Sequence, residues 1–215
     1  MTEQAEINGH VLDLLPEKAI YWSGRNLLLI ADLHLGKINH FRRSGVPLPV
    51  QPNSENLERF IGLLQRYRPS RVIFLGDLFH SHYNDEWEAF GQVLRHFPEI
   101  SFELVMGNHD IMSRHQYDKH RLLLHEVMLK IDGFVLTHEP GEYDGYNLAG
   151  HIHPGVRMQG RGRQRLKFPC FHFTPRQGIL PAFGAFTGVH PVRPKKEDKV
   201  YIVADERVIR VEQKK

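Results

Sequence analysis

The sequence contains a single cysteine, Cys170, so an internal disulfide bond is excluded and a reducing compartment is expected. Long apolar runs are missing too: stretches such as residues 27–31 fall far short of the roughly 18 residues that cross a bilayer. The first residues, MTEQAEIN, are acidic and polar and do not resemble a targeting segment. These absences predict a cytoplasmic protein without membrane association.

Acidic residues are absent from one long stretch, residues 145–196, which carries nine Lys and Arg side chains. Because the whole chain has a net charge of only +3, the remainder of the sequence is acidic. A basic segment beside a reactive centre would attract an extended polyanion such as nucleic acid. A solvated basic loop or hairpin explains the charge equally well.

The residues that are present are typical of a packed globular protein, with 41% hydrophobic and 25% charged side chains. A chain of 215 residues can bury a sizeable core without disulfides, and no linker or repeat divides it. We therefore expect one domain over residues 1–215.

Short β-like runs end abruptly in polar residues at four places. These are NLLLIA before Asp32, RVIFL before Gly76, FELVM before Gly107 and GFVLT before His138. Helical spacing of apolar residues predicts one helix from a Ser54 cap to a stop at Pro69, and a second over residues 85–97. Alternating strands and helices predict an α/β core, whose ligands bind at the carboxyl ends of strands.

The sequence after Leu166 changes to short strand-like pieces that are broken by Pro and Gly. They are KFPCFHF, GILPAFGAF, KVYIVA and RVIRVE. This pattern predicts a closing antiparallel sheet.

Five polar clusters follow one another along the chain: Asp32-Leu33-His34, Gly76-Asp77, Gly107-Asn108-His109-Asp110, Thr137-His138 and Gly150-His151-Ile152-His153. Each cluster alone is a weak signal of a metal site, because a lone histidine is more often structural than a metal ligand. Together they suit a pair of divalent cations about 3.5–4 Å apart, which activate a water and clamp phosphate oxygens. Side chains two residues apart at a strand end would point the same way.

These clusters resemble the signature of the calcineurin-like metallophosphoesterase superfamily, D-x-H, G-D, G-N-H-D/E, H and G-H-x-H. The segments ADLHLGK, FRRSGVPLP, LGDLFHS, GNHD, THEP, AGHIHP and LPAFGAFTG also resemble the bacterial DNA ligase-associated metallophosphoesterase group, over roughly residues 31–188. The resemblance implies an α/β fold, a four-layer sandwich of two mixed β-sheets flanked by α-helices.

The resemblance also implies a role for each matching residue. It assigns Asp32, His34 and His153 to a first metal and Asn108, His138 and His151 to a second, with Asp77 bridging both. His109 would bind no metal and would face the substrate, where it protonates the leaving oxygen or stabilises the transition state. Asp110 would fix the loop.

The sequence departs from the protein-phosphatase branch of this superfamily, whose G-D-x-x-D places an acid beside the catalytic histidine. Here Gly76-Asp77-Leu78-Phe79 is followed by His80. We interpret His80 as positioning His109 or a phosphate oxygen, and a structural hydrogen bond to the backbone remains an equal alternative.

Two groups of basic residues are candidates for binding substrate phosphates. Lys37, Arg42 and Arg43 follow the first metal motif, and Arg161, Arg163 and Arg165 belong to a run too dense to share one apolar face. Part of that run should therefore be exposed. A solvated surface is the alternative for each residue.

The predicted function is a two-metal-dependent phosphoesterase of the phosphodiesterase or nuclease type, which hydrolyses phosphate esters by a metal-bridging hydroxide. DNA or a related phosphodiester in DNA repair is the expected substrate, and the resemblance implies association with a DNA ligase and a helicase. The alternatives are a small-molecule phosphodiesterase or phosphomonoesterase and a non-catalytic scaffold. Mn²⁺ is the metal that the family suggests, and Fe, Zn, Co or Ni also suit nitrogen and oxygen ligands.

Overall fold

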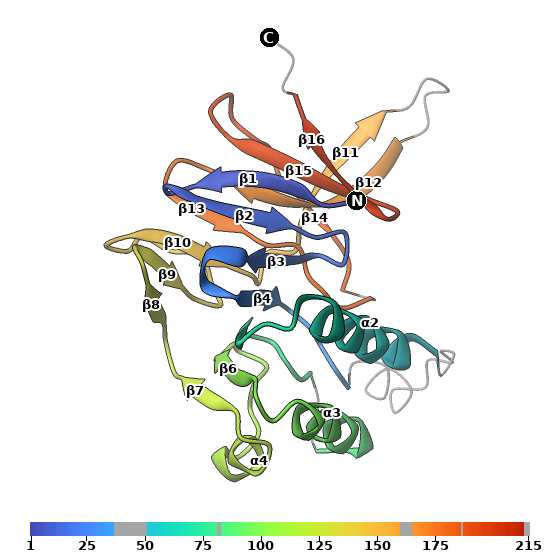
Figure 1. The fold of residues 1–215 in the computed structure, drawn as a ribbon. Helices are drawn as coiled ribbons and strands as arrows, with labels where there is room; N and C mark the ends of the chain where they lie inside the picture. Colours follow the sequence, from blue (N-terminus) through green and yellow to red (C-terminus); the bar gives the residue numbers. More distant parts are fainter. Residues whose placement is uncertain (37–50, 81–82, 160–164, 186, 213–215) are drawn as a thin grey trace.

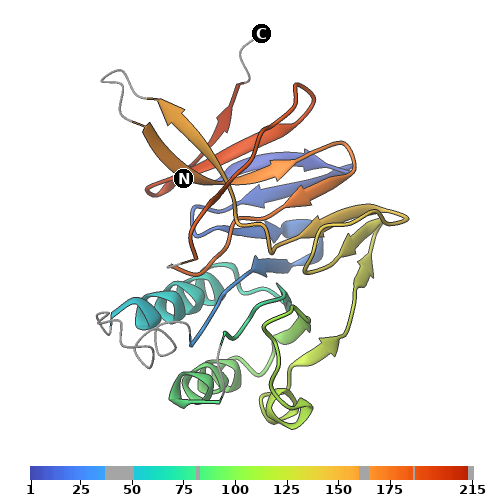
Figure 2. The same cartoon turned by 180° about the vertical axis from the view of Figure 1, so that it is seen from behind.

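Two β-sheets pack face to face in the computed structural model, which describes residues 1–36, 51–80, 83–159, 165–185 and 187–212. The helices lie at one end of the molecule, and strands of both sheets form the other end (Figure 1). The view from behind shows the same division (Figure 2). Among the described residues, no helix combines the length and apolar character needed to span a membrane.

The first sheet has seven strands in sequence order. Its first four strands are antiparallel neighbours, and the pairs from β4 to β7 are parallel. The strands are β1 (Glu3–Ile7), β2 (His10–Leu14), β3 (Ala19–Trp22), β4 (Leu27–Ala31), β5 (Arg71–Leu75), β6 (Ser101–Val105) and β7 (Leu123–His125). The predicted runs before Asp32, Gly76 and Gly107 are β4, β5 and β6.

The hairpin of β1 and β2 lies outside the predicted runs. It turns at Asn8 and Gly9, whose φ angles are 50° and 77°. An Asn-Gly pair between two alternating segments is a strong hairpin signal, because both positions tolerate positive φ. The sequence therefore holds the information needed to place this hairpin.

The second sheet has nine strands and is mixed. Seven lie in the order β14-β11-β12-β13-β10-β9-β8, and β15 joins through β12 and pairs with β16. The strands are β8 (Leu129–Ile131), β9 (Phe134–Leu136), β10 (Tyr146–Ala149), β11 (Pro154–Gln159), β12 (Arg165–Phe173), β13 (Gln177–Ile179), β14 (His190–Pro191), β15 (Lys199–Ala204) and β16 (Arg207–Val211). The predicted closing pieces pair antiparallel with one another, β12 with β13 and β15, and β15 with β16. The sheet as a whole is mixed because β13 also runs parallel to β10, and β14 runs parallel to β11.

Three α-helices are described: α2 (Gln51–Tyr67), α3 (Asp85–His96) and α4 (Arg114–Lys119), and a short 3₁₀ helix, η1 (Ser23–Arg25), precedes β4. Helix α2 ends before Pro69 as predicted, but it already includes Ser54, so the predicted cap at that residue is wrong. Helix α3 ends one residue before the predicted Phe97, and the Asn84 side chain caps it by accepting a hydrogen bond from the Glu86 N–H.

Two large apolar clusters stabilise these layers. One packs α2, α3 and α4 on the first sheet through residues such as Phe60, Phe74 and Trp87. The other fills the space between the sheets and includes Leu29 and Phe171. The predicted class, two mixed sheets flanked by helices, is confirmed. In the described part of the chain, the helices cover the first sheet, and a small apolar cluster that includes Cys170, Val200 and Ile202 occupies the outer face of the second.

The packing between the sheets predicts the effect of one truncation. Phe171 is fully buried there, so Phe171→Ala should lower the free energy of unfolding by about 3–5 kcal/mol through lost burial and a residual cavity. Val11 is 49% exposed on β2, and Val11→Ala should change stability by less than about 0.5 kcal/mol. Urea unfolding of both variants would measure the difference, and equal midpoints would contradict this description of the core.

Candidate metal centre

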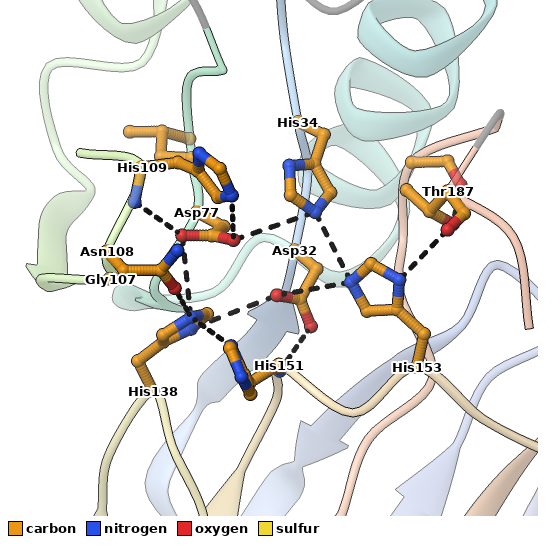
Figure 3. A network of polar contacts seen from close by, with 12 residues as sticks. Asp32, His34, Asp77, Gly107, Asn108, His109, His138, His151, His153 and Thr187 are labelled. Carbon is orange, nitrogen blue, oxygen red and sulfur yellow. Dashed lines mark hydrogen bonds and ion pairs between the residues drawn. The ribbon is translucent and has the colours of Figure 1, made fainter. Parts of the chain in front are cut away.

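The five predicted polar clusters meet at one edge of the sandwich, where loops follow the carboxyl ends of strands from both sheets (Figure 3). Backbone hydrogen bonds join the loops. The His34 N–H donates to the Asp77 carbonyl at 2.9 Å, and the Gly150 N–H donates to the His138 carbonyl at 3.0 Å. Residues far apart in the sequence are thereby brought into one site.

The backbone of this site adopts an uncommon conformation. Five polar residues have positive φ angles between 48° and 65°: Asp32, His34, Asp77, His151 and His153. Non-glycine residues rarely adopt this left-handed region, and such strain gathers at functional sites. In both the D-x-H and the H-x-H motif, the left-handed backbone therefore directs the side chains into the site. The prediction that side chains two residues apart on a strand point the same way does not apply there.

Two glycines leave room for these side chains. A Cβ atom at Gly76, where φ is 72°, would overlap the His138 ring, and a Cβ atom at Gly107 would overlap the Asp77 carboxylate. Any larger residue at either position would displace a site residue. The glycines of the G-D and G-N-H-D clusters are therefore required by space.

The first group of converging side chains is formed by Asp32, His34 and His153, whose ligand atoms lie within 4.8 Å of one another. The Nε2 atoms of His34 and His153 are 3.3 Å apart, and His153 Nε2 is 3.6 Å from Asp32 Oδ1. Asp32 is fully buried, and its other oxygen, Oδ2, accepts a hydrogen bond from the His151 N–H at 2.9 Å.

The second group is formed by Asp77, His138 and His151, with ligand atoms again within 4.8 Å of one another. His138 Nε2 lies 3.0 Å from His151 Nδ1 and 3.4 Å from Asp77 Oδ1. The Asn108 side-chain oxygen is also 3.0 Å from His138 Nε2, so Asn108 extends this group.

Asp77 belongs to the second group and also faces the first. Its Oδ1 faces His138, and its Oδ2 is 3.8 Å from His34 Nε2. One carboxylate thus offers an oxygen to each side, the arrangement that a bridging ligand requires.

Divalent cations fit these residues, because the carboxylate oxygens and the facing nitrogens of His138 and His153 offer lone pairs. His138 Nδ1 lies 3.1 Å from the Leu75 carbonyl and His153 Nδ1 lies 3.0 Å from the Thr187 carbonyl. A carbonyl only accepts, so each Nδ1 donates and each Nε2 points an unprotonated lone pair into the site. Asp32 Oδ1 is buried without a hydrogen-bond partner among the described residues. Such a cluster of acceptors repels itself unless a cation lies among them.

His109 lies at the rim of the two groups. Its Nε2 is 4.0 Å from Asp77 Oδ2, its side chain is 43% exposed, and its backbone N–H donates to Asp77 Oδ1 at 3.0 Å. The His80 ring packs on the His109 ring with centroids 3.9 Å apart, and it also contacts the His34 ring at 5.1 Å. The structure therefore places His80 beside His109.

Asp110 joins two of the loops instead of contributing to either group. Its carboxylate accepts hydrogen bonds from the backbone N–H groups of Leu78, Phe79 and Gly107 at 3.0, 3.3 and 2.8 Å. Burial raises the pKa of this carboxyl to about 7, although the Gly107 and Phe79 N–H donors oppose the shift. The structure agrees with the predicted role in fixing the loop.

The predicted phosphate-binding residues are only partly described. Arg165 is an exposed residue at the start of β12. Lys37, Arg42, Arg43, Arg161 and Arg163 lie outside the described residues.

The structure adds one residue to the site that the sequence motifs do not contain. Lys18 and His153 line a cavity of about 180 Å³, and the Lys18 ammonium donates to the Ala182 carbonyl at 3.1 Å. Burial, followed by the nearby Arg59 charge, lowers the pKa of Lys18 to about 8. No motif surrounds Lys18 in the sequence, so only the tertiary structure places it here.

Comparisons with known proteins agree with this geometry. The family model for the calcineurin-like phosphoesterases matches residues 25–184. The crystal structure of nuclease MPE from Pseudomonas putida is similar at 28% identity and a TM-score of 0.82, over 98% of this chain and 100% of that chain. A protein of unknown function from Aquifex aeolicus, AQ665, has 18% identity and a TM-score of 0.43, over 59% of this chain and 78% of that one. A search of curated proteins gives no match.

The family match covers most of the chain and includes every residue of the two groups, from Asp32 to His153. The geometry of these loops is that of a metal-dependent phosphoester hydrolase, as predicted. The chain belongs to the calcineurin-like phosphoesterase family.

Proposed function

We propose that this protein is a two-metal phosphodiesterase that cleaves nucleic acid, with DNA undergoing repair as its substrate. The observation that carries the proposal is the pair of ligand groups on either side of Asp77, with the exposed His109 at their rim. Cations held by two neighbouring ligand groups would suit the in-line displacement at a phosphate, and the exposed histidine is accessible to a substrate.

The metal ligands in this proposal are those that the two groups bring together. Asp32, His34 and His153 hold one cation, Asn108, His138 and His151 hold the other, and Asp77 binds both. When bound, the cations supply an activated water and neutralise charge on the phosphate oxygens. We propose Mn²⁺ for both positions on the basis of the family; Fe, Zn, Co and Ni also accept such ligands.

His109 acts in this proposal as the proton donor to the leaving oxygen. Its Nε2 lies close enough to the Asp77 carboxylate to be oriented, and its exposure lets it reach a bound phosphate. His80 positions the His109 ring through the contact between the two rings. No acid takes the place that the protein-phosphatase branch gives to the aspartate of its dyad.

A nucleic acid substrate is supported by two independent observations. The similar Pseudomonas putida protein is a nuclease, and it aligns over nearly the whole chain. The acid-free stretch at residues 145–196 begins beside the metal centre and supplies positive charge. We propose that Lys37, Arg42, Arg43, Arg161, Arg163 and Arg165 bind phosphates of the substrate.

The proposed compartment and partners follow from the resemblance to the DNA ligase-associated metallophosphoesterase group. We propose that residues 1–215 act as a single domain in the cytoplasm. The functional partners in this proposal are a DNA ligase and a helicase.

The substrate is tested by one metal-reconstituted sample. It should hydrolyse single- or double-stranded DNA and the small diester bis(p-nitrophenyl) phosphate, with a kcat/KM for DNA that falls steeply between 50 and 200 mM salt because released counterions oppose polyanion binding. Activity on the small diester should change little over that range. Turnover of diesters or monoesters without cleavage of DNA would favour the small-molecule alternative.

The proposed bridging role predicts the effect of Asp77→Ala. Both cations lose a ligand, so the variant should lose bound metal together with activity. Metal analysis after gel filtration would measure the loss. Asp144→Ala, which removes an exposed carboxylate, should keep its metal content. Two tightly bound metals per chain in Asp77→Ala would rule out the bridge.

The proposed proton donor predicts a different outcome for His109→Ala. This variant should retain metal but lose about 10²- to 10⁴-fold in kcat, the range typical of a lost general acid. The loss should be greater for DNA, whose leaving group is poor, than for a p-nitrophenyl ester. His96→Ala, at an exposed histidine of α3, serves as the control. A near-normal rate on DNA would remove His109 from the mechanism.

A further inference from the structure

An antiparallel ribbon begins directly at the metal centre. Strand β11 starts at Pro154, the residue after His153, and pairs with the first half of β12 from Gly155↔Pro169 to Gln159↔Arg165. In both ribbon views, these two strands extend past the rest of the second sheet (Figure 1, Figure 2). In the described part of the sheet, residues 165–169 pair with β11 alone, since β13 and β15 pair with β12 from Cys170 onward.

The direction of β13 shows at which edge the ribbon extends. After β13, the chain reaches the metal centre, where the Gly184 N–H donates to the Asp32 carbonyl at 3.0 Å. Because β12 is antiparallel to β13, its first residues lie on the side of the sheet at which β13 ends. The ribbon therefore projects from the edge that carries the metal centre.

The two faces of the ribbon differ in character. On β12, Phe171 is buried between the sheets and Cys170 faces the outer cluster. Side chains alternate along a strand, so Lys167 and Arg165 share the inner face with Phe171. Arg157 pairs directly with Lys167 and belongs to the same face. The inner face of the ribbon, which continues the surface between the sheets past the metal centre, is thus basic.

The opposite face of the ribbon is apolar. Val156 pairs with Phe168, and both pack against the small outer cluster. Met158 pairs with Leu166 farther out, where these side chains are 39% and 51% exposed. The ribbon is therefore amphipathic, and its positive charge is concentrated on the inner face.

The inner face is continuous with the metal centre. Pro169, two residues from Lys167 on the same face of β12, lines the 180 Å³ cavity together with His153 and Lys18. A line of positive side chains thus leads from Lys18, beside a proposed metal ligand, to Lys167, Arg157 and then Arg165. Four residues of extended strand span roughly 13 Å along the ribbon.

The charges on this face lack partners within the described structure. Arg157, Arg165 and Lys167 are exposed, and none of them forms an ion pair with a described residue. Like charges directly opposite on neighbouring strands are destabilising, so the Arg157 and Lys167 pair weakens the free ribbon. A bound polyanion would remove this repulsion and replace it with attraction.

We propose that the inner face of the ribbon is a phosphate-binding track, on which a nucleic acid strand lies as it leaves the metal centre. The proposal rests on the function proposed above and specifies how a polymeric substrate is held beyond the cleaved bond. Contacts to phosphates position a strand without reading its sequence. The track therefore favours long strands over short ones and is indifferent to base composition.

The test uses the double variant Arg157→Gln/Lys167→Gln in the metal-loaded full-length protein. With a single-stranded oligonucleotide, its KM should rise roughly ten- to sixtyfold at 0.1 M salt, and the slope of log KM against log salt should fall by about 1.4, because two phosphate contacts are lost. The ratio of kcat/KM for the oligonucleotide to that for bis(p-nitrophenyl) phosphate should fall with it. Arg157→Lys/Lys167→Arg, which keeps both charges, should retain the wild-type KM.

The control removes two charges outside the ribbon. Arg176 and Arg193 are exposed in the same acid-free stretch and line a separate cavity of about 1030 Å³, so Arg176→Gln/Arg193→Gln should leave KM and the salt slope unchanged. The inference is overturned by an unchanged KM in the ribbon variant, by an equal loss in the control, or by an equal loss in the charge-keeping variant. Failure of the wild-type protein to cleave any nucleic acid would instead remove the proposed function itself.

Discussion

Mutual repulsion between converging acceptors is the constraint on which this structure depends. Carboxylate oxygens and imidazole nitrogens lie 3.0–3.8 Å apart in the centre of the site. Such an arrangement is unfavourable in an empty protein, and a folded framework has to impose it. The two apolar clusters supply the framework. The backbone carbonyl of Leu75 fixes which ring nitrogen of His138 faces inward, and that of Thr187 does the same for His153.

The composition of the site could be predicted from the sequence because each cluster follows an apolar run. Parallel strands bring their carboxyl ends to one edge of a sheet, so the sequence alone predicts that Asp32, Asp77 and Asn108 lie close together. The D-x-H spacing is not explained by the expected alternation of side chains at a strand end. Asp32 and His34 lie in left-handed backbone beyond the strand. Asp and His are enriched among non-glycine residues with positive φ, but this preference alone does not identify the turn in a sequence.

Other parts of the site depend on information that no local pattern carries. A backbone carbonyl such as that of Thr187 can orient His153 whatever its own side chain is, so composition does not reveal it. Lys18 reaches the centre through a tertiary contact across the chain. The two faces of the ribbon likewise follow from the pairing of Arg157 with Lys167, whereas charge density alone predicts only that some of these residues are exposed.

Both ligand groups combine residues from the two sheets. Asp32 and His34 follow β4 of the first sheet and meet His153 from the second, while Asp77 follows β5 and meets His138 and His151. During synthesis the first sheet emerges from the ribosome well before β10 and β11. Until those strands arrive, it offers only Asp32 and His34 of the first group and Asp77 of the second. A cation bound by either group would therefore hold residues of both sheets together, and neither site is complete until both sheets exist.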